Sequence, residues 1–246
     1  MKYTAHDIAR MIDISALKFD TTQQQVDDMI AACKKYDIGC AFVMSCYSAY
    51  LKEQLAGTTT EFGTSLGFPS GQYYTGTKVQ EAEYFMGLDA DQVDMVINVG
   101  WLKSGMYDEV AADITAVRKA TQGTSLKVII EASLLTDDEI TKACQIVADC
   151  GADYVKSGTG FSAPTTLHHV EVMANAIKGR DIKFKVAGGV KDLKTLLQMR
   201  EYGVDRFGIG MKNSISIIEE AAAFSDGVEL SMIAGETSSN SNAEAY

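Results

Sequence analysis

The chain has 246 residues with 33 acidic and 22 basic side chains, which gives a formal net charge of −11. A diffuse negative charge disfavours binding to nucleic acids or to anionic membranes, although it leaves room for a local basic pocket. No apolar run reaches the ~20 residues needed to span a bilayer. We therefore expect no nucleic-acid partner and no membrane partner.

The five cysteines form no Cys-x-x-Cys pair, and the N-terminus lacks the apolar stretch of a secretory leader. An odd count without such a leader favours reduced thiols, so we expect a cytoplasmic protein. Free cysteines are among the most buried residues, and most of these side chains are expected to pack in the core.

Short apolar runs alternate with longer amphipathic stretches along the chain. Runs rich in Val, Ile and Phe have the composition of strands buried on both faces. The clear strand candidates are residues 40–44, 64–67, 93–98, 127–131, 153–157, 183–187 and 206–210. A weaker candidate at 11–15 precedes them and brings the number to eight.

The stretches between these strands have apolar residues at helical spacing. The expected helices cover residues 21–36, 75–87, 107–120, 137–150, 192–202 and 214–224. Thr21 or Thr22 could cap the first of them, and Thr136 with Glu139 forms a capping-box pattern. Pro164 suits the first turn of a further helix after the 153–157 strand.

Eight strands that alternate with helices within about 225 residues favour a closed (β/α)₈ barrel over an open sheet. We predict a single TIM-barrel domain over residues 1–224, with a short helix at its N-terminus. Residues 225–246 contain few apolar side chains, and we expect them to form a mobile polar tail.

Three ionisable residues interrupt apolar strands, namely Asp94, Lys156 and Lys185. In a barrel of this kind the functional site lies at the carboxyl ends of the strands. A buried charge costs several kcal/mol unless it is paired, so the presence of these residues in buried strands needs an explanation. A salt-bridged network in the core is one interpretation, and a catalytic group is the other.

The chemistry of this trio suits amine catalysis. Lysine attacks a carbonyl only as the free amine, and its ordinary pKa is about 10.4. Burial and a second ammonium nearby both lower that pKa toward neutrality. The carboxylate of Asp94 could then transfer protons to and from the carbinolamine and the substrate hydroxyl.

Short motifs follow one another in a fixed order over most of residues 7–224. They are Ile-Asp at 12–13, Leu-Lys at 17–18, Gly-Phe-Pro-Ser-Gly at 67–71, Val-Asp-Met-Val-Ile-Asn-Val-Gly at 93–100, Lys-Ser-Gly at 103–105, Lys-Val-Ile-Ile-Glu at 127–131, Leu-Leu-Thr at 134–136, Gly-Ala-Asp-Tyr-Val-Lys at 151–156, Lys185, Gly-Gly-Val at 188–190 and Arg-Phe-Gly at 206–208. This series resembles the deoxyribose-phosphate aldolase family.

The resemblance implies a class I aldolase of carbohydrate catabolism. The family reversibly cleaves 2-deoxy-D-ribose 5-phosphate to acetaldehyde and D-glyceraldehyde 3-phosphate, without a metal or an organic cofactor. By this resemblance Lys156 forms the Schiff base, Lys185 lowers its pKa and Asp94 transfers protons. Asp13 matches a residue that supports the family's site, and a structural contact near the N-terminus is the alternative role for it. By analogy with the family we expect a homodimer.

The family binds phosphate through backbone N–H groups of glycine-rich turns after the last three strands. Glycine lets backbone donors approach an oxyanion closely, and helix N-termini add positive potential. A tight turn explains any one glycine pair, whereas turns at adjacent strand ends favour a phosphate site. The matching residues are Gly160, Gly188, Gly189, Val190, Gly208 and Gly210, with Thr159 in a supporting position.

Four stretches depart from the family's usual pattern, at residues 12–17, 43–46, 157–160 and 210–212. The last of these has Gly-Met-Lys where the family usually has serines. All four fall around the acceptor end of the substrate, so the aldol chemistry is a safer expectation than the substrate. Lys212 could replace a lost phosphate contact, or it could be a surface lysine at the start of a helix.

The last residue of the chain is Tyr246. Some family members end in a tyrosine on a flexible tail that reaches the site and aids proton transfer, and the resemblance extends that role to Tyr246. A chain end without any role is the alternative. His6, His168 and His169 are the only histidines, which is a poor set for a metal-dependent aldolase, and we predict no metal site.

Two other functions stay open. One is a related lysine aldolase that acts on another deoxy-sugar phosphate or on a non-phosphorylated aldehyde acceptor. The other is a non-catalytic barrel that binds a sugar phosphate, which the intact trio of Asp94, Lys156 and Lys185 disfavours.

Overall fold

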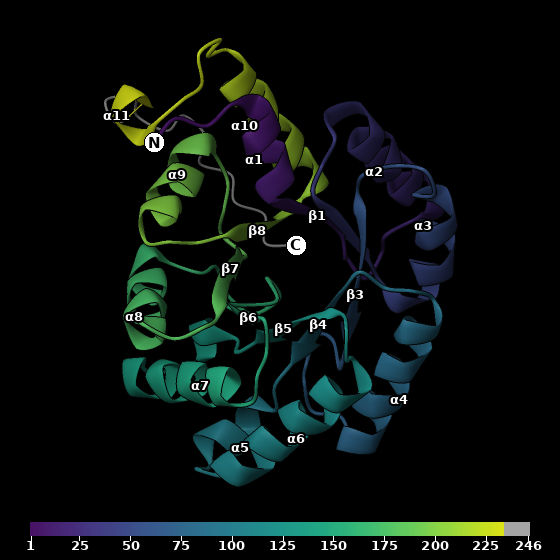
Figure 1. Ribbon diagram of the computed structural model, residues 1–246, viewed down its shortest axis with the longest axis vertical. Coiled ribbons are helices and arrows are strands. Elements are labelled where there is room, and N and C mark those ends of the chain that lie inside the picture. Colours follow the sequence, from purple (N-terminus) through teal and green to yellow (C-terminus); the bar gives the residue numbers. More distant parts are fainter. Residues whose placement is uncertain (234–246) are drawn as a thin grey trace.

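Eight parallel strands form a closed barrel in the computed structural model of the chain, which describes residues 1–233 (Figure 1). The strands are β1 (Ile12–Ala16), β2 (Cys40–Val43), β3 (Glu61–Leu66), β4 (Gln92–Val96), β5 (Ser125–Ile129), β6 (Tyr154–Lys156), β7 (Lys183–Ala187) and β8 (Arg206–Gly210). Each strand pairs in parallel with the next, and β8 pairs with β1. The predicted single (β/α)₈ barrel is therefore confirmed.

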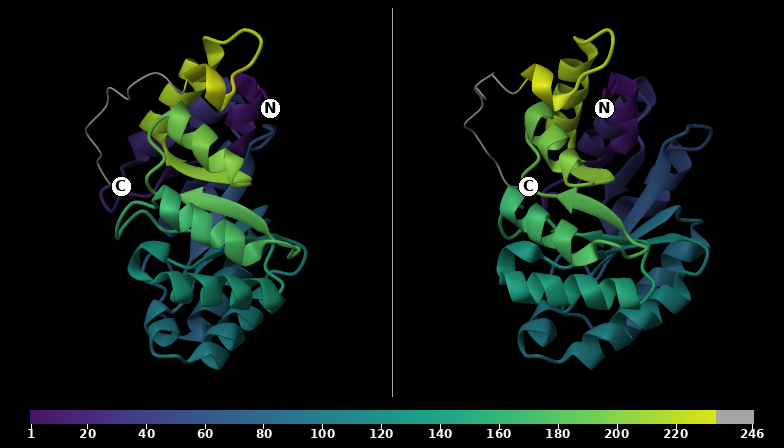
Figure 2. Two further views of the ribbon diagram at one scale, coloured as in Figure 1. Left: turned by 90° about the vertical axis from the view of Figure 1, so that its left-hand side faces the viewer. Right: turned by 60° about the vertical axis from the view of Figure 1, so that its left-hand side comes forward.

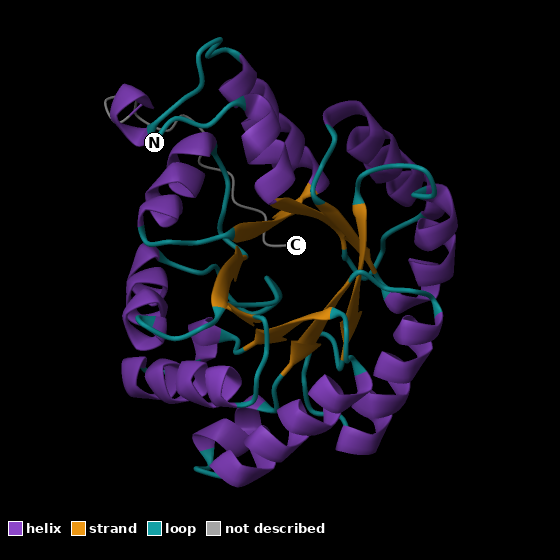
Figure 3. Cartoon of the chain, in the orientation of Figure 1, coloured by secondary structure: helices purple, strands orange, loops and turns teal. Residues whose placement is uncertain are grey.

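Helices surround the strands on the outside of the barrel (Figure 3). They are α1 (Ala5–Met11), α2 (Gln23–Tyr36), α3 (Ser48–Gln54), α4 (Thr75–Gly87), α5 (Val99–Lys103), α6 (Tyr107–Ala120), α7 (Asp137–Asp149), α8 (Leu167–Ile177), α9 (Leu193–Glu201), α10 (Met211–Ala222) and α11 (Leu230–Ile233), with 3₁₀ turns η1 (Ser45–Tyr47) and η2 (Ala132–Leu134). Within the described residues, no helix has both the length and the apolar character needed to cross a membrane.

Local sequence signals account for most helix starts. Thr136 caps α7 and forms the predicted capping box with Glu139, and Thr22 rather than Thr21 caps α2. The prediction for Pro164 is wrong. The helix begins at Leu167, because the Thr166 side chain accepts a hydrogen bond from the third residue of α8 and closes a capping box there.

The alternation along each strand places charged residues inside the barrel. In β4 the side chains of Val93 and Met95 belong to the apolar layer between barrel and helices. Asp94 points the other way, into the barrel, where it meets lysines from β6 and β7. One strand can thus be apolar throughout on its helix side and still present an ionisable group inside.

The segment after α10 returns to the N-terminus of the chain (Figure 2). Tyr3 and Val228 exchange two backbone hydrogen bonds of 2.8 Å each, and the side chains of Val228 and Ile233 are buried. Residues 225–233, the first part of the predicted polar tail, therefore contact the barrel. The remainder of that tail, residues 234–246, lies outside the described residues.

Candidate active site

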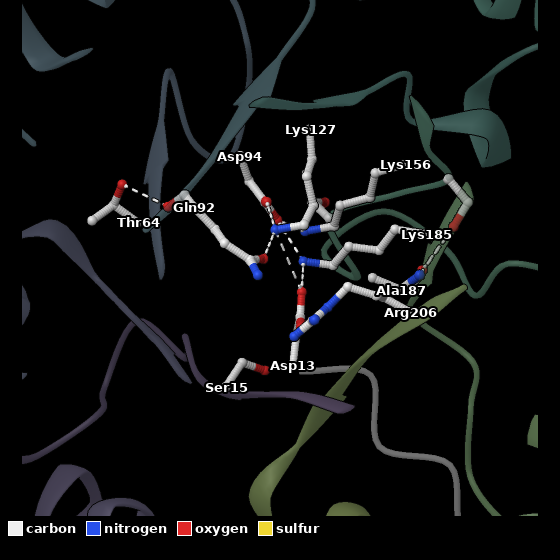
Figure 4. A network of polar contacts seen from close by, with 12 residues as sticks. Asp13, Ser15, Thr64, Gln92, Asp94, Lys127, Lys156, Lys185, Ala187 and Arg206 are labelled. Carbon is white, nitrogen blue, oxygen red and sulfur yellow. Dashed lines mark hydrogen bonds and ion pairs between the residues drawn. The ribbon is translucent and has the colours of Figure 1, made fainter. Parts of the chain in front are cut away.

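Charged side chains from six strands meet inside the barrel (Figure 4). They are Asp13 from β1, Asp94 from β4, Lys127 from β5, Lys156 from β6, Lys185 from β7 and Arg206 from β8. The predicted trio of Asp94, Lys156 and Lys185 is thus brought together, and Asp13 lies in the same cluster. Lys156 is only 4% exposed, so these charges interact with little screening by water.

Asp94 is the centre of the cluster. Its Oδ2 accepts hydrogen bonds from Lys156 Nζ at 2.7 Å and from Lys185 Nζ at 2.8 Å. Lys127 Nζ lies 3.4 Å from the other carboxylate oxygen of Asp94. One carboxylate therefore stands between the two predicted lysines, at hydrogen-bond distance from both.

Asp13 holds the opposite side of the cluster. Lys185 Nζ lies 2.6 Å from Asp13 Oδ2, and Arg206 donates to Asp13 Oδ1 through Nε at 2.7 Å. The backbone of β1 pairs with β8 beside it, so Asp13 ties the first strand to the last two. It is both a structural partner and a direct neighbour of Lys185.

The charges in the cluster give the two lysines of the trio different proton affinities. Burial lowers the pKa of Lys156 to about 8, the positive charges of Lys185 and Lys127 add to this effect, and Asp94 opposes it. Burial alone would lower the pKa of Lys185 too, but Asp13 and Asp94 together raise it above its ordinary value. Of these two lysines, Lys156 is therefore the one that more readily becomes a free amine near neutral pH.

The carboxyl groups stay ionised. Burial by itself would raise the pKa values of Asp13 and Asp94, but the neighbouring cations outweigh burial and hold both pKa values below the ordinary range. Burial also lowers the pKa of Lys127, with Asp94 opposing and Lys185 adding to the decrease. The cluster thus combines fixed carboxylates, a firmly protonated Lys185 and a lysine that can lose its proton.

The loops after β6 and β7 pack directly against each other through glycines. A Cβ on Gly189, whose φ is +91°, would lie 2.7 Å from the carbonyl oxygen of Thr165. A Cβ on Gly188 would lie 3.2 Å from the Cα of Gly160. Of the residues predicted to hold phosphate, these three therefore stand side by side.

Gly208 has a different environment from the loop glycines. It lies within β8, and a Cβ at this position would meet Ala187 at 2.7 Å and Lys185 Cε at 3.5 Å. The absence of a side chain here leaves room for the Lys185 stem. This packing accounts for a glycine at this position independently of any ligand.

Four of the remaining predicted positions lie around the same end of the barrel. Gly210 is the residue that precedes α10, and Lys212 is an exposed residue in the first turn of that helix. Val190 is buried just after β7. Thr159 is buried after β6, and its backbone N–H donates to Glu131 Oε2 at 3.1 Å. Tyr246 lies outside the described residues.

The sequence matches the model of one protein family, described as DeoC/LacD family aldolase, over residues 8–211. This range runs from α1 to the start of α10 and includes all six charged residues of the cluster. The chain belongs to the DeoC/LacD family of aldolases.

This aldolase matches its relatives over most of their length. A deoxyribose-phosphate aldolase of Streptococcus equi subsp. zooepidemicus is 42% identical over 203 residues, which are 82% of this chain and 92% of the relative. One from Finegoldia magna is 40% identical, with 87% of this chain and 99% of the relative covered. Among solved structures, QR15, an aldolase, is 32% identical with a TM-score of 0.81, over 87% of this chain and 95% of that one.

Three further residues that contact the candidate site were not among the predicted site residues: Lys127, Glu131 and Arg206. Lys127 is a charged residue in an apolar strand, so the criterion that selects Asp94 would have selected it too. Arg206 is the first residue of β8, and a charged residue at the end of a strand does not by itself indicate a functional site. Glu131 follows β5 with a φ of +52°, and nothing in its local sequence signals that conformation.

A cavity of about 410 Å³ opens at the carboxyl ends of β4 and β5. Its lining includes Val96, Glu131, Gln72 and Lys103. Val96 follows Asp94 by two residues in the same strand, so its side chain lies on the same face of β4. Within residues 1–233, no group of three or more His, Cys, Asp or Glu side chains is arranged to hold a metal ion.

Proposed function

We propose that this aldolase reversibly cleaves 2-deoxy-D-ribose 5-phosphate to acetaldehyde and D-glyceraldehyde 3-phosphate, with Lys156 as the residue that forms the imine. The observation that carries the proposal is the hydrogen bond of 2.7 Å between the buried Lys156 amine and Asp94. The substrate is proposed from the relatives at 40–42% identity, which are named deoxyribose-phosphate aldolases.

Lys156 would attack the aldehyde carbon of the open-chain sugar as a free amine. With a pKa of about 8, roughly a tenth of this amine is unprotonated at pH 7, against less than a thousandth for a lysine at about 10.4. Loss of water then gives the imine. The bond between C2 and C3 of the sugar then breaks as the C3 hydroxyl loses its proton, which releases the phosphorylated aldehyde and leaves the two-carbon enamine on Lys156.

Asp94 and Lys185 would move and hold protons around that amine. Asp94 Oδ2 contacts both lysines, so it can take a proton from the carbinolamine and return one. Lys185 keeps its positive charge because two carboxylates contact it. The role of this charge is to disfavour the protonated form of Lys156. Asp13 of β1 supports that role, because its carboxylate keeps Lys185 protonated.

The phosphate would bind at the loops after the last three strands. The candidate residues are Thr159, Gly160, Gly188, Gly189, Val190, Gly208, Gly210 and Lys212. Support comes from the close contact of the β6 and β7 loops and from the start of α10, a 12-residue helix that directly follows β8. Lys212 is exposed in the first turn of this helix and could approach an anion there.

Compartment and assembly belong to the same proposal. The cysteines of residues 1–233 are all free thiols, and Cys33, Cys40 and Cys144 are buried, in keeping with a reducing cytoplasm. We propose a homodimer by analogy with the family. Sedimentation velocity would measure the mass in solution, and a monomer at micromolar concentration would contradict the dimer.

Borohydride trapping tests the central proposal. The protein is incubated with acetaldehyde or 2-deoxy-D-ribose 5-phosphate plus borohydride, and the adduct is located by mass spectrometry. We expect one reduced adduct on Lys156, and Lys156→Ala should abolish both the adduct and turnover. An adduct on another lysine, or none, would contradict the mechanism. Comparison of cleavage rates for phosphorylated and unphosphorylated deoxyribose tests the substrate.

A further inference from the structure

Ser65 of β3 directs its side chain into the barrel. Phe62 and Leu66 of the same strand belong to the apolar layer between barrel and helices, so Gly63 and Ser65 face the interior. The Phe42 ring bears this out for Gly63, because it lies where a Cβ on Gly63 would be. That ring also lies against the lysines of the charged cluster. The hydroxyl of Ser65 is therefore on the same side of the barrel wall as the catalytic charges.

Ser65 is the direct neighbour of Asp94 in the barrel wall. The two residues pair between β3 and β4, so their side chains leave the same face of strands that are about 4.8 Å apart. Asp94 Oδ2 accepts hydrogen bonds from Lys156 and Lys185. Its Oδ1 accepts none within residues 1–233, although Lys127 Nζ lies 3.4 Å from it. A hydroxyl and a carboxylate oxygen with spare hydrogen-bonding capacity thus stand side by side.

The Ser65 hydroxyl has no partner in the part of the chain that the structure describes. Ser65 is only 5% exposed, and its Oγ makes no hydrogen bond there. A buried hydroxyl without a partner lowers stability, because it gives up its hydrogen bonds to water on folding. Alanine would occupy the same place on β3 without this cost. The position therefore favours a ligand that enters the barrel and bonds to the hydroxyl.

A hydroxyl beside a carboxylate suits the oxygen that reacts in aldol cleavage. The substrate is joined through C1 to Lys156, whose Nζ lies 2.7 Å from Asp94, so its C3 oxygen is held within a few bonds of that carboxylate. During cleavage the C3 hydroxyl loses its proton and its oxygen becomes a carbonyl. A carboxylate can take the proton, and a neighbouring hydroxyl can donate to the oxygen as negative charge develops on it.

We infer that Ser65 is a catalytic residue that donates a hydrogen bond to the C3 oxygen of the substrate while Asp94 takes the proton of that hydroxyl. The inference rests on the proposed function, because it needs the substrate joined to Lys156. As the C2–C3 bond breaks, its electron pair forms the C1–C2 double bond of the enamine, and the imine nitrogen regains its own pair. The C3 oxygen becomes the carbonyl of the released aldehyde. Ser65 transfers no proton, and no oxidant or reductant is required.

Ser65→Ala tests the inference through two reactions of the same enamine. One is cleavage of 2-deoxy-D-ribose 5-phosphate, in which the C3 oxygen reacts. The other is exchange of the methyl protons of acetaldehyde for deuterium in heavy water, measured by NMR, and acetaldehyde has no C3 oxygen. We expect kcat for cleavage to fall by about tenfold to a hundredfold, between the loss of an ordinary hydrogen bond and that of an oxyanion donor. The exchange rate should stay unchanged.

Ser48→Ala is the matched control. Ser48 is the first residue of α3, is 1% exposed, and has an Oγ that likewise makes no hydrogen bond within residues 1–233. It belongs to a helix and not to the barrel wall, so its substitution should leave both reactions unchanged. Thermal unfolding should give both variants a Tm no lower than that of the unaltered protein, since neither hydroxyl has a partner to lose.

The comparison of the two reactions decides the role of Ser65. An unchanged kcat for cleavage in Ser65→Ala would overturn the inference. Equal losses in cleavage and exchange would overturn it too, because they would place the effect on Lys156 and not on the C3 oxygen.

Borohydride trapping of acetaldehyde on the unaltered protein separates the two proposals. Trapping on Lys156 together with normal cleavage by Ser65→Ala would refute only the role of Ser65. Absence of trapping would refute the proposed function and this inference with it.

Discussion

Two lysines on adjacent strands of this barrel differ in proton affinity because they have different numbers of carboxylate neighbours. Lys185 contacts both Asp13 and Asp94, which raise its pKa, whereas Lys156 contacts Asp94 alone. With a single carboxylate to oppose burial, the pKa of Lys156 falls to about 8. Residue type cannot distinguish Lys156 from Lys185, whereas the distribution of carboxylates around the two lysines can.

Lys185→Leu should raise the pKa of Lys156. The substitution removes a positive charge near Lys156 and frees Asp94 to stabilise the ammonium form. Since only the free amine reacts, the acid limb of the kcat/KM profile should move from about pH 8 to higher pH. A pKa that is higher by one leaves about tenfold less free amine at neutral pH and slows the reaction in proportion. Cleavage of 2-deoxy-D-ribose 5-phosphate measured from pH 6 to 10 checks this, and a limb that stays in place would contradict it.

Lys127→Met is the matched substitution on β5. Lys127 also lowers the pKa of Lys156, but its charge contributes less than that of Lys185. It lies 3.4 Å from Asp94 Oδ1 and leaves the oxygen shared by Lys156 and Lys185 untouched. The acid limb should therefore move in the same direction by a smaller amount. A larger movement than in Lys185→Leu would mean that the two lysines exchange roles.

At the level of elements, a buried ion pair joins two helices to the strand that holds Asp94. Lys78 of α4 lies 2.6 Å from Asp113 of α6, and both side chains are almost fully buried. Lys78 Nζ also donates to the carbonyl oxygen of Val96, the last residue of β4, at 2.8 Å. A second contact, from the Thr75 hydroxyl to Asp113, completes the arrangement. The pair thus fixes the carboxyl end of β4 from outside the barrel.

Lys78→Met should lower the free energy of unfolding by about 3–5 kcal/mol, because it leaves the Asp113 carboxylate buried without its cation. The double substitution Lys78→Met/Asp113→Leu removes both charges and should lose clearly less. Urea denaturation followed by circular dichroism measures all three proteins. Equal losses in the single and double variants would show that packing, and not the unpaired charge, determines the effect.

For the whole molecule, the two ends of the described chain meet on one side of the barrel. The backbone bridge between Tyr3 and Val228 joins the segment before α1 to the segment after α10, and α1 itself packs against α10. Both termini of the barrel are thereby held beside β1 and β8. Tyr246 follows this anchored segment by 13 residues, the separation from Ile233 (246 − 233).

Tyr246→Phe tests whether the end of the chain takes part in catalysis. If its hydroxyl transfers a proton at the enamine carbon, the substitution should lower kcat by about tenfold or more, the scale of general acid–base catalysis. Borohydride trapping on Lys156 should stay intact, since the imine forms without that proton. Tyr202→Phe, at an exposed tyrosine after α9, is the control. An unchanged kcat in Tyr246→Phe would leave the chain end without a catalytic role.

The amino-acid sequence by itself determined the barrel and the three central residues of the candidate site. Strands buried on both faces need continuous apolar runs, and a single charge within such a run is visible locally. Asp94, Lys156 and Lys185 can therefore be selected without knowledge of any contact. Helix starts with strong caps, such as the one at Thr136, can also be predicted from the sequence. Pro164 is a weaker signal for a helix start than the competing cap at Thr166.

Only the tertiary structure decided how these charges are paired. Asp13 and Arg206 are 193 residues apart, and they meet because the barrel closes between β1 and β8. The same closure gives Lys185 two carboxylates and Lys156 one, and this difference moves their pKa values in opposite directions. Proton affinity depends on burial and on distances between charges from different strands, and neither quantity is a property of a local stretch of sequence.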